Sequence, residues 1–386
     1  MKNIMKFEID KTANNISFLV TTMITIIIMG CIFFTGFHYS QLSLVEKNNA
    51  AKGVKDLYWK MAEEYNGEFS DEMIKAVLEE YIHEYQTIQV EKRPFNLFAS
   101  NIADVFFPKD KDIYVEMNDA IREGKEISID EVGIYSIKDT DFTSFKTPLK
   151  LGNYVPWFNF FKVSGYIFIL ASMVGIIISS LSFSNDSSKK IDQLLFTTKY
   201  GRSKLVKAKI CVPVILSMLI YLVMIIISII VFLIFNHGTS GWEASIQTNF
   251  CMNLHSLPLE ANNLMIWLMT ICFYCVNLLA IIGITVFISS LLKNPVGSLL
   301  VSIGVFFLPL GLTYIFKQGM IAELLYLFPI NNFDVEKMLS ILSSKSIILS
   351  GSILSNYFMI LVMAVVVFVA ACTITYIRTK NKKNIS

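Results

Sequence analysis

Six long stretches of this sequence are mostly apolar and contain no charged side chain, and they constrain the fold more than any other feature. An α-helix rises about 1.5 Å per residue, so roughly 20 apolar residues cross the ~30 Å hydrocarbon layer of a bilayer. Hydrophobic residues make up 54% of the whole chain. The sequence therefore predicts an all-α membrane protein with six transmembrane helices, at 16–37, 163–183, 210–235, 264–292, 296–316 and 357–377.

Lysine and arginine are distributed unevenly among the segments that connect these helices. On one side of the membrane, the segments 1–15, 184–209 and 378–386, together with Lys293, hold 15 basic and four acidic residues. The other side holds the remaining 18 basic and 27 acidic residues. Because positively charged loops stay in the cytoplasm, we expect both termini to be cytoplasmic. The many Lys, Asn and Ile residues are typical of an AT-rich bacterial genome, which favours a bacterial plasma membrane.

The longest connection, 38–162, is then expected to be an extracellular domain inserted between the first two transmembrane helices. Ser70 is placed to cap the second of its predicted helices. Gly133 and several β-branched residues between 127 and 147 leave room for a few short strands. The domain is accordingly either a small α/β domain or mostly α. The stretches with helical patterns are Tyr39–Tyr65, Asp71–Gln86 and Tyr114–Glu123.

The last predicted outer loop, 317–356, contains an apolar stretch at 321–330. This stretch is too short to cross a bilayer, so it fits a re-entrant or interfacial segment. The turn-forming residues from Pro329 to Asn332 are expected to end it.

The cytoplasmic segment 184–209 combines basic charge with a helical apolar pattern. Ile191, Leu194 and Leu195 are spaced at i, i+3 and i+4, so a helix places them on one face. Membrane topology alone accounts for the basic charge of the segment. It does not account for the apolar face, which indicates a site where another protein binds.

Two small residues predict where this short helix ends and where the third transmembrane helix begins. Gly201 offers a left-handed conformation that would end the first helix. Ser203 is placed to cap the next one. The segment is therefore expected to form a helix beside the membrane, a sharp turn, and a helix that enters the membrane.

The sequence contains no motif for nucleotide or metal chemistry. The phosphate-binding pattern GxxxxGK[ST] does not occur, and neither do HExxH or GxSxG. His237 and His255 in the outer loop 236–263 lack a third ligand in register, so no metal site is expected. The six apolar stretches contain none of the ionisable residues that proton-driven pumps place inside the membrane. Energy for any transport would come from a partner.

In these features the chain resembles the permease subunits of type-2 ABC exporters, in the branch with a large extracellular domain between the first two spans. The resemblance rests on the six spans, on the charged segment 1–15 as a cytoplasmic elbow helix, and on residues 192–202. These last residues have the amphipathic helix, threonine-rich turn and arginine of the family's coupling helix. The sequence departs from the family at Lys199, where a proline is usual, and at 188–190, where Glu and Gly are usual.

The resemblance implies a transport subunit that is not itself an enzyme and binds no cofactor. A cytoplasmic ABC ATP-binding subunit would hold ATP and magnesium, and a second permease chain, identical or paralogous, would complete the pathway within the lipid bilayer. No nucleic-acid partner is expected. The residues implied to contact the ATP-binding subunit are Ile191, Asp192, Leu194, Leu195, Thr197, Thr198 and Arg202. The residues implied for the elbow are Phe7, Glu8 and Lys11.

The predicted function is export of an amphipathic or hydrophobic substrate, such as an antimicrobial peptide, a lipid or a drug. Aromatic and methionine side chains in the spans suit apolar cargo, although such side chains also face lipid or the protein core. The alternative is a membrane sensor whose extracellular domain signals to a cytoplasmic partner. A secondary carrier is disfavoured because the spans contain no charge.

Overall fold

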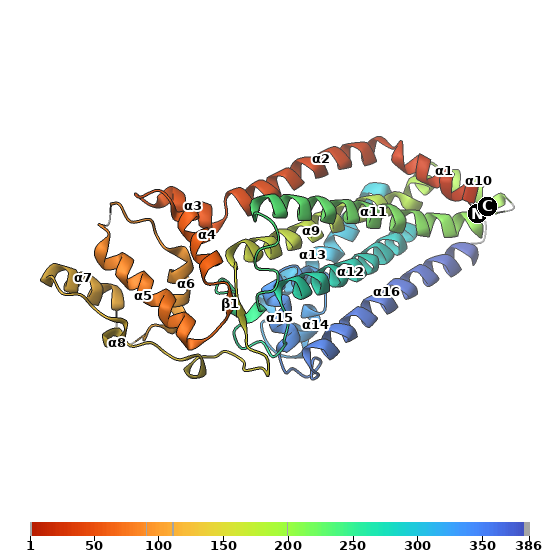
Figure 1. Cartoon of the computed structure of the whole chain (residues 1–386). Coiled ribbons are helices and arrows are strands. Elements are labelled where there is room, and N and C mark those ends of the chain that lie inside the picture. Colours follow the sequence, from red (N-terminus) through yellow and green to blue (C-terminus); the bar gives the residue numbers. More distant parts are fainter. Residues whose placement is uncertain (1, 90, 110–111, 199, 382–386) are drawn as a thin grey trace. The chain divides into compact units, whose positions relative to one another are not determined.

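The computed structural model describes residues 2–89, 91–109, 112–198 and 200–381, and its regular structure is mostly helical. Lys199 and residues 382–386 of the predicted basic tail lie outside this described part. Six described helices are long and apolar enough to cross a membrane, which confirms the predicted number of candidate spans. They are α2 (Ile16–Phe33, continued by the π-helix η1, Phe34–His38), α9 (Val155–Ser188), α11 (Lys204–Phe235), α12 (Asn263–Leu291), α13 (Pro295–Ile315) and α16 (Ile353–Asn381) (Figure 1).

The chain forms two compact units, and both are assembled from stretches that are far apart in sequence. The first, which we call the bundle unit, comprises Met1–Phe33, Val163–Ile230 and Met269–Ser386. The second, which we call the inserted unit, comprises Phe34–Lys162 and Val231–Leu268. The connection between α11 and α12 therefore belongs to the same unit as the long connection between α2 and α9.

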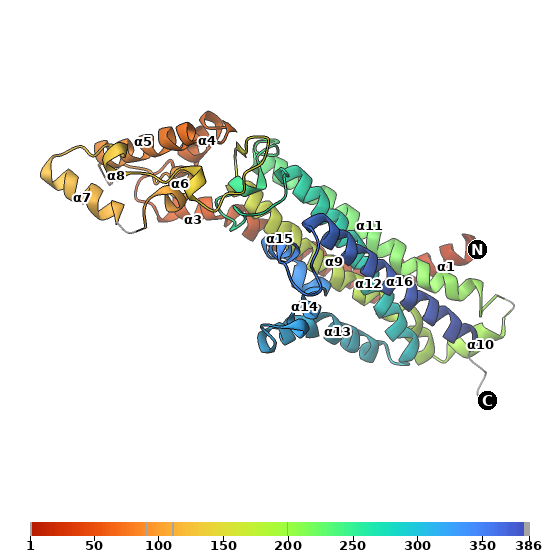
Figure 2. The same cartoon turned by 90° about the horizontal axis from the view of Figure 1, so that it is seen from below.

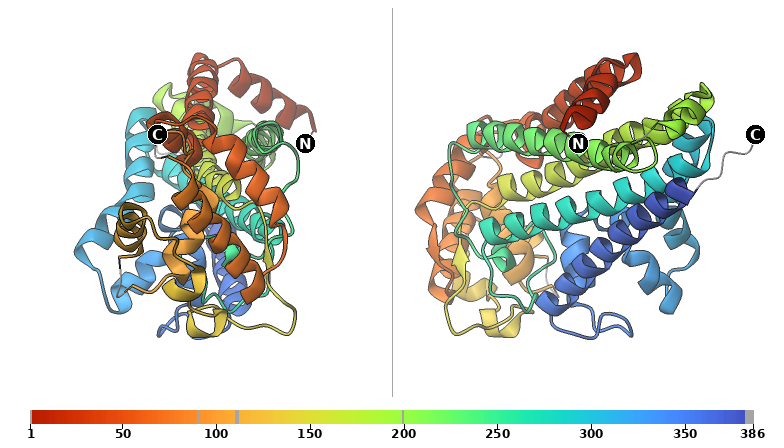
Figure 3. Two further views of the ribbon diagram at one scale, coloured as in Figure 1. Left: turned by 60° about the vertical axis from the view of Figure 1, so that its left-hand side comes forward. Right: turned by 90° about the vertical axis from the view of Figure 1, so that its right-hand side faces the viewer.

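Helices α9 and α12 are the most buried of the six candidate spans. Within their most apolar windows, 72% of α9 and 61% of α12 is buried, compared with 6% of α2. Gly175 of α9 allows a close approach, since a Cβ there would lie 3.4 Å from the Ile282 side chain of α12. The Ser289 hydroxyl of α12 donates to the Ser180 carbonyl over 2.7 Å and accepts from the Phe183 amide over 3.1 Å. Figure 3 shows α9, α11, α12 and α16 running alongside one another.

Shorter helices complete the bundle unit. The predicted segment 321–330 forms α14 and the start of η4, so it is helical on both sides of Leu327 and Phe328. After η4, the Phe333 carbonyl accepts a 2.6 Å hydrogen bond from the Tyr274 hydroxyl of α12. Gly165 of α9 lies so close to the same carbonyl that any side chain would overlap with it. These helices are α1 (Lys2–Ala13), α10 (Ile191–Thr197), α14 (Met320–Tyr326), η4 (Pro329–Asn332) and α15 (Val335–Ser343).

The inserted unit is mostly helical, which decides between the two folds that the sequence left open. Strands β1 (Gly67–Glu68) and β2 (Lys150–Leu151) pair antiparallel, with Gly67 opposite Leu151, as its one described sheet. Its helices are α3 (Gln41–Asn48), α4 (Val54–Glu64), α5 (Asp71–Thr87), α6 (Leu97–Phe106), α7 (Ile113–Glu123), α8 (Ile129–Val132) and the short 3₁₀ helices η2 (Ile137–Asp139) and η3 (Ile246–Thr248).

The prediction of one helix over Tyr39–Tyr65 is wrong, because the chain breaks between α3 and α4. Gly53 adopts a left-handed conformation with φ of 102° directly before α4. The Glu46 carboxylate accepts hydrogen bonds from the amides of Gly53 and Lys55, at 3.1 and 3.0 Å. These amides at the start of α4 are thus satisfied by a side chain of α3, which stabilises the break.

The short strands expected between 127 and 147 are also absent from the described residues. This region instead forms α8 and η2. Each begins with a capping box, formed by Ser128 with Glu131 and by Ser136 with Asp139. These local hydrogen bonds favour helical turns over the intrinsic strand preference of the β-branched residues.

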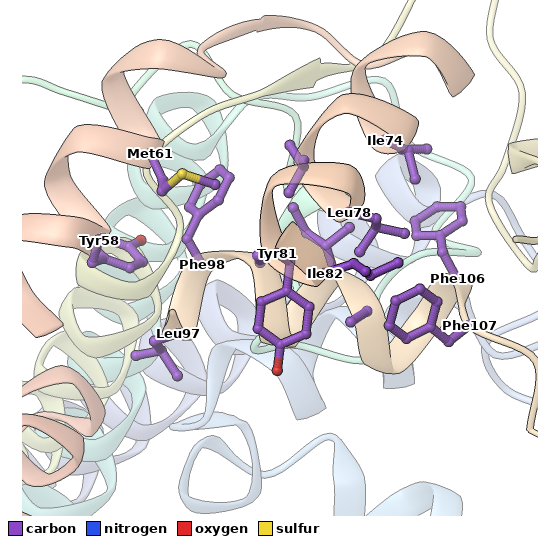
Figure 4. Packing of buried hydrophobic residues seen from close by; sticks show 14 of the residues in the cluster. Tyr58, Met61, Ile74, Leu78, Tyr81, Ile82, Leu97, Phe98, Phe106 and Phe107 are labelled. Atoms are coloured by element: carbon purple, nitrogen blue, oxygen red, sulfur yellow. The ribbon is translucent and has the colours of Figure 1, made fainter. Parts of the chain in front are cut away.

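A hydrogen-bonded network at the centre of the inserted unit joins its two stretches of sequence. The Tyr58 hydroxyl donates to Asn153 Oδ1 over 2.8 Å and accepts from the Val155 amide over 3.0 Å. Asn153 Nδ2 in turn donates to Asn236 Oδ1 over 2.7 Å. Burial raises the pKa of Tyr58 well above its usual value, which keeps its hydroxyl a donor. Around this network the apolar core includes Met61 and Phe98 (Figure 4).

Replacing Tyr58 by Phe should loosen the inserted unit without removing its aromatic packing. The Val155 amide and the Asn153 side-chain oxygen would lose their buried partner, at a cost of about 1–3 kcal/mol. Amide hydrogen exchange should accelerate about 5- to 100-fold in α4 and α6. The matched control is Tyr135→Phe, since Tyr135 is partly exposed. Equal exchange rates in the two variants would show that the network contributes nothing.

Candidate functional site

The short helix α10 lies between two of the candidate spans. Helix α9 ends at Ser188, and Lys190 then adopts a left-handed conformation with φ of 56°. This turn is tied to the next helix, since the Ser187 hydroxyl donates to the Asp192 carboxylate over 3.2 Å. Helix α10 and the N-terminal helix α1 lie at the same end of the bundle unit (Figure 1).

Helix α10 presents apolar side chains to its surroundings. Ile191 is 41% exposed and Leu194 is 71% exposed. Leu195 is half-buried and, with Phe196, lines a cavity of about 280 Å³ whose other walls include the ends of α9 and α16. The three residues predicted to share an apolar face therefore divide, with two pointing outward and one packing toward the bundle. Two exposed aliphatic side chains, three residues apart, therefore lie on one side of this seven-residue helix.

The threonines that follow are engaged with the helix itself. The Thr197 hydroxyl donates to the Leu194 carbonyl and the Thr198 hydroxyl donates to the Leu195 carbonyl, both over 2.7 Å. The Thr198 amide also donates to the Leu195 carbonyl over 3.2 Å, so both threonines bond back to the end of α10. Arg202 is half-buried and lies in the turn that connects α10 to α11.

The predicted role of Gly201 is wrong in its mechanism. Its backbone is not left-handed, and α10 already ends at Thr197 with Thr198 in an extended conformation. A side chain at Gly201 would instead overlap with the Leu195 carbonyl. Glycine is required here because the chain folds back against α10. Ser203 directly precedes α11, and its carbonyl accepts from the Lys207 amide over 3.2 Å.

A cluster of four charged residues, three of them buried, ties α1 to the two spans that flank α10. Lys11 of α1 donates to Asp186 of α9 over 2.6 Å. Lys209 of α11 pairs with the same carboxylate and lies 3.8 Å from Glu8 of α1. Lys209 also donates to the Ser182 carbonyl over 2.9 Å. We call Glu8, Lys11, Asp186 and Lys209 the elbow cluster.

The elbow cluster is largely shielded from water and electrically balanced. The side chains of Asp186 and Lys209 are 4% and 3% exposed, and that of Glu8 is 7% exposed. Two carboxylates and two ammonium groups compensate one another, which is the condition for burying charge. Of the predicted elbow residues, Glu8 and Lys11 belong to this cluster, whereas Phe7 is exposed.

Asp186 and Lys209 are the site residues that sequence reasoning missed. Asp186 is one of only two acids in the basic segment 184–209, and Lys209 directly precedes an apolar stretch. An isolated acid among bases, beside a lysine at a membrane boundary, is the signal that could have found them. Among the described residues, no group of three or more His, Cys, Asp and Glu side chains is placed to hold a metal ion.

Replacing Lys209 by Met should destabilise the bundle unit. After this change, Lys11 is the one positive charge left beside Asp186 and Glu8 in the described part of the chain. Breaking a buried ion pair in this way costs about 3–5 kcal/mol. Thermal unfolding of the detergent-solubilised protein should shift down by several degrees. The control is Lys207→Met on the exposed side of α11.

A double-mutant cycle separates the ion pair from mere loss of packing. If Asp186 and Lys209 act as a pair, Asp186→Asn combined with Lys209→Met should cost less than the sum of the single changes. Additive effects would contradict the assignment of a coupled pair.

A family model described as "ABC-2 family transporter protein" matches residues 2–380, nearly the full length. No curated protein and no solved structure matches the chain. The chain therefore belongs to the ABC-2 family of transporter proteins, which makes it a multi-pass membrane permease of an ABC transporter that works with an ATP-binding subunit.

Proposed function

We propose that this permease is the pathway subunit of an exporter and that α10 is the helix on which its ATP-binding subunit acts. The observation behind this proposal is the exposure of Leu194 and Ile191 on a short helix that connects two spans. An apolar helix face of this kind fits a groove on a partner protein. Asp192, Leu195, Thr197, Thr198 and Arg202 would contribute to the same contact.

The charge distribution supports a cytoplasmic position for α10. The segments 1–15, 184–209 and 378–386 carry the excess of basic residues, and the positive-inside rule then favours a cytoplasmic position for both termini and α10. The inserted unit would lie outside the cell. We propose a bacterial plasma membrane as the location.

The elbow cluster gives a physical route for the force. Asp186 at the end of α9 and Lys209 at the start of α11 bond to each other, and Lys11 of α1 bonds to the same carboxylate. A displacement of α10 would therefore move both flanking spans and α1 together. ATP and magnesium would stay in the partner subunit, and a second permease chain, identical or paralogous, would form the other half of the pathway.

Charged substitutions on α10 test this docking directly. Leu194→Glu should abolish co-purification with the co-expressed ATP-binding subunit, because a carboxylate cannot be buried unpaired in an apolar groove. Ile191→Glu, at the other exposed aliphatic position of α10, should have the same effect. The matched control is Leu44→Glu, since Leu44 is an exposed leucine on α3 of the inserted unit. A complex that survives both α10 changes would refute the docking assignment.

We propose an amphipathic or hydrophobic substrate, because the six long apolar stretches within the spans contain no charged side chain. In inverted vesicles that contain the permease and its ATP-binding subunit, ATP should drive uptake of a fluorescent amphipathic peptide or lipid. The Leu194→Glu variant should reduce that uptake to the level without ATP.

A sensor is the second candidate, and a cavity of the inserted unit with charged residues in its wall is the observation in its favour. This cavity of about 540 Å³ is lined by Glu68, Lys150 and Trp242, among others, beside the β1–β2 sheet. Ligand binding by the full chain, with no ATP-dependent movement of any offered cargo, would support a sensor over an exporter.

A further inference from the structure

The bundle unit contains an apolar cavity away from α10 and the elbow cluster. The cavity has a volume of about 320 Å³ and is lined by α12, α13, α16 and the segment from α14 to η4. Figure 2 shows α13 and α14 side by side along the bundle. This volume is at the lower end of the range in which proteins bind small molecules.

The walls of the cavity are almost entirely apolar. Ile281 of α12, Phe306 of α13 and Ile360 of α16 are buried in its lining. None of the lining residues has an ionisable side chain. A charged ligand would have no counter-charge there, so desolvation would exclude it.

The open side of the cavity is formed by exposed faces of α13 and α16, which would contact lipid chains in a membrane. Val305 of α13 and Met363 and Val367 of α16 line it, and all three are exposed. Both helices are candidate membrane spans, and their most apolar windows are only 22% buried. A ligand would therefore enter sideways from the membrane interior.

One polar group in the wall lacks a partner. Ser302 is 3% exposed, and its hydroxyl makes no hydrogen bond to any residue in the described part of the chain. The other polar groups of the lining behave differently, since Thr285 donates to the Ile281 carbonyl over 2.9 Å and Asn277 donates to the Phe273 carbonyl over 2.8 Å. Ser302 therefore has a donor to offer in a place where no water competes for it.

The depth of Ser302 distinguishes between two kinds of ligand. It lies seven residues after Pro295, the first residue of α13, which corresponds to about 10 Å along the helix axis. At this depth in a ~30 Å hydrocarbon layer, a phospholipid chain has no hydrogen-bonding group. A small molecule dissolved in the membrane can bring one.

We propose that this cavity is a binding site for an uncharged, membrane-dissolved small molecule that carries a hydrogen-bond acceptor, and that the acceptor pairs with the Ser302 hydroxyl. The site belongs to a single permease chain and does not require the ATP-binding subunit. It is thus independent of the docking proposed for α10.

Benzophenone is a suitable probe, because it is apolar, uncharged and photoreactive, and its carbonyl is an acceptor. The full-length chain in phosphatidylcholine vesicles should be labelled saturably on peptides of α12, α13 and α16. Ala364→Phe, which fills the cavity from α16, should reduce this labelling at least fivefold. The matched control is Ala370→Phe, on an exposed position of the same helix, which should leave it unchanged.

A second comparison tests the hydroxyl. Ser302→Ala should raise the half-saturating benzophenone concentration about 3- to 10-fold, as expected for one lost hydrogen bond. Labelling by 3-phenyl-3-(trifluoromethyl)diazirine, which has no carbonyl, should not change. If Ala364→Phe does not fold, Ala280→Phe fills the cavity from α12 instead.

Three results would overturn the proposal. The first is labelling that does not saturate and is equal in Ala364→Phe and Ala370→Phe, which would mean general contact with lipid-facing surfaces. The second is a complete lack of benzophenone labelling on the cavity peptides of the wild-type chain. This result would mean that a second permease chain covers this side. The third is an equal effect of Ser302→Ala on both probes.

Discussion

The pairing of Asp186 with Lys209 is the interaction on which the α10 end of the bundle unit depends. These side chains lie at the end of α9 and near the start of α11, so their bond closes the chain around α10. Lys11 and Glu8 add α1 to the same cluster. Each group alone would be expensive to bury next to hydrocarbon, and each is stable there only because the others are present. The position of α10 is therefore set by charges in the helices on either side of it, while Leu194 of α10 stays exposed.

The features that depend on local pattern could be predicted from the sequence. Uncharged apolar stretches identify the candidate spans because a bilayer demands length and internal hydrogen bonding. The spacing of Ile191, Leu194 and Leu195 similarly indicates α10. Ser70 was predicted as a cap, and its hydroxyl accepts from the Met73 amide over 3.3 Å at the start of α5.

The features that depend on distant contacts could not be predicted in this way. Lys11 and Asp186 are 175 residues apart, so no local spacing connects them. Gly201 looked like a left-handed helix end, but its actual constraint is the nearby Leu195 carbonyl, which only the folded chain brings there. The break at Gly53 depends on Glu46 reaching across the turn to bind amides. In each case a residue's role is set by a partner that its neighbours in sequence do not reveal.

The division of the inserted unit between two stretches of sequence has a consequence for biosynthesis. Asn236, the partner of Asn153, is made 83 residues later, after α9 and α11 have been synthesised. At 5–20 residues per second, a ribosome needs roughly 4–17 s to reach it. During that interval the nascent Phe34–Lys162 segment lacks part of its final core and remains open to proteases and chaperones. Completion of the inserted unit therefore reports that the second and third candidate spans have already been made.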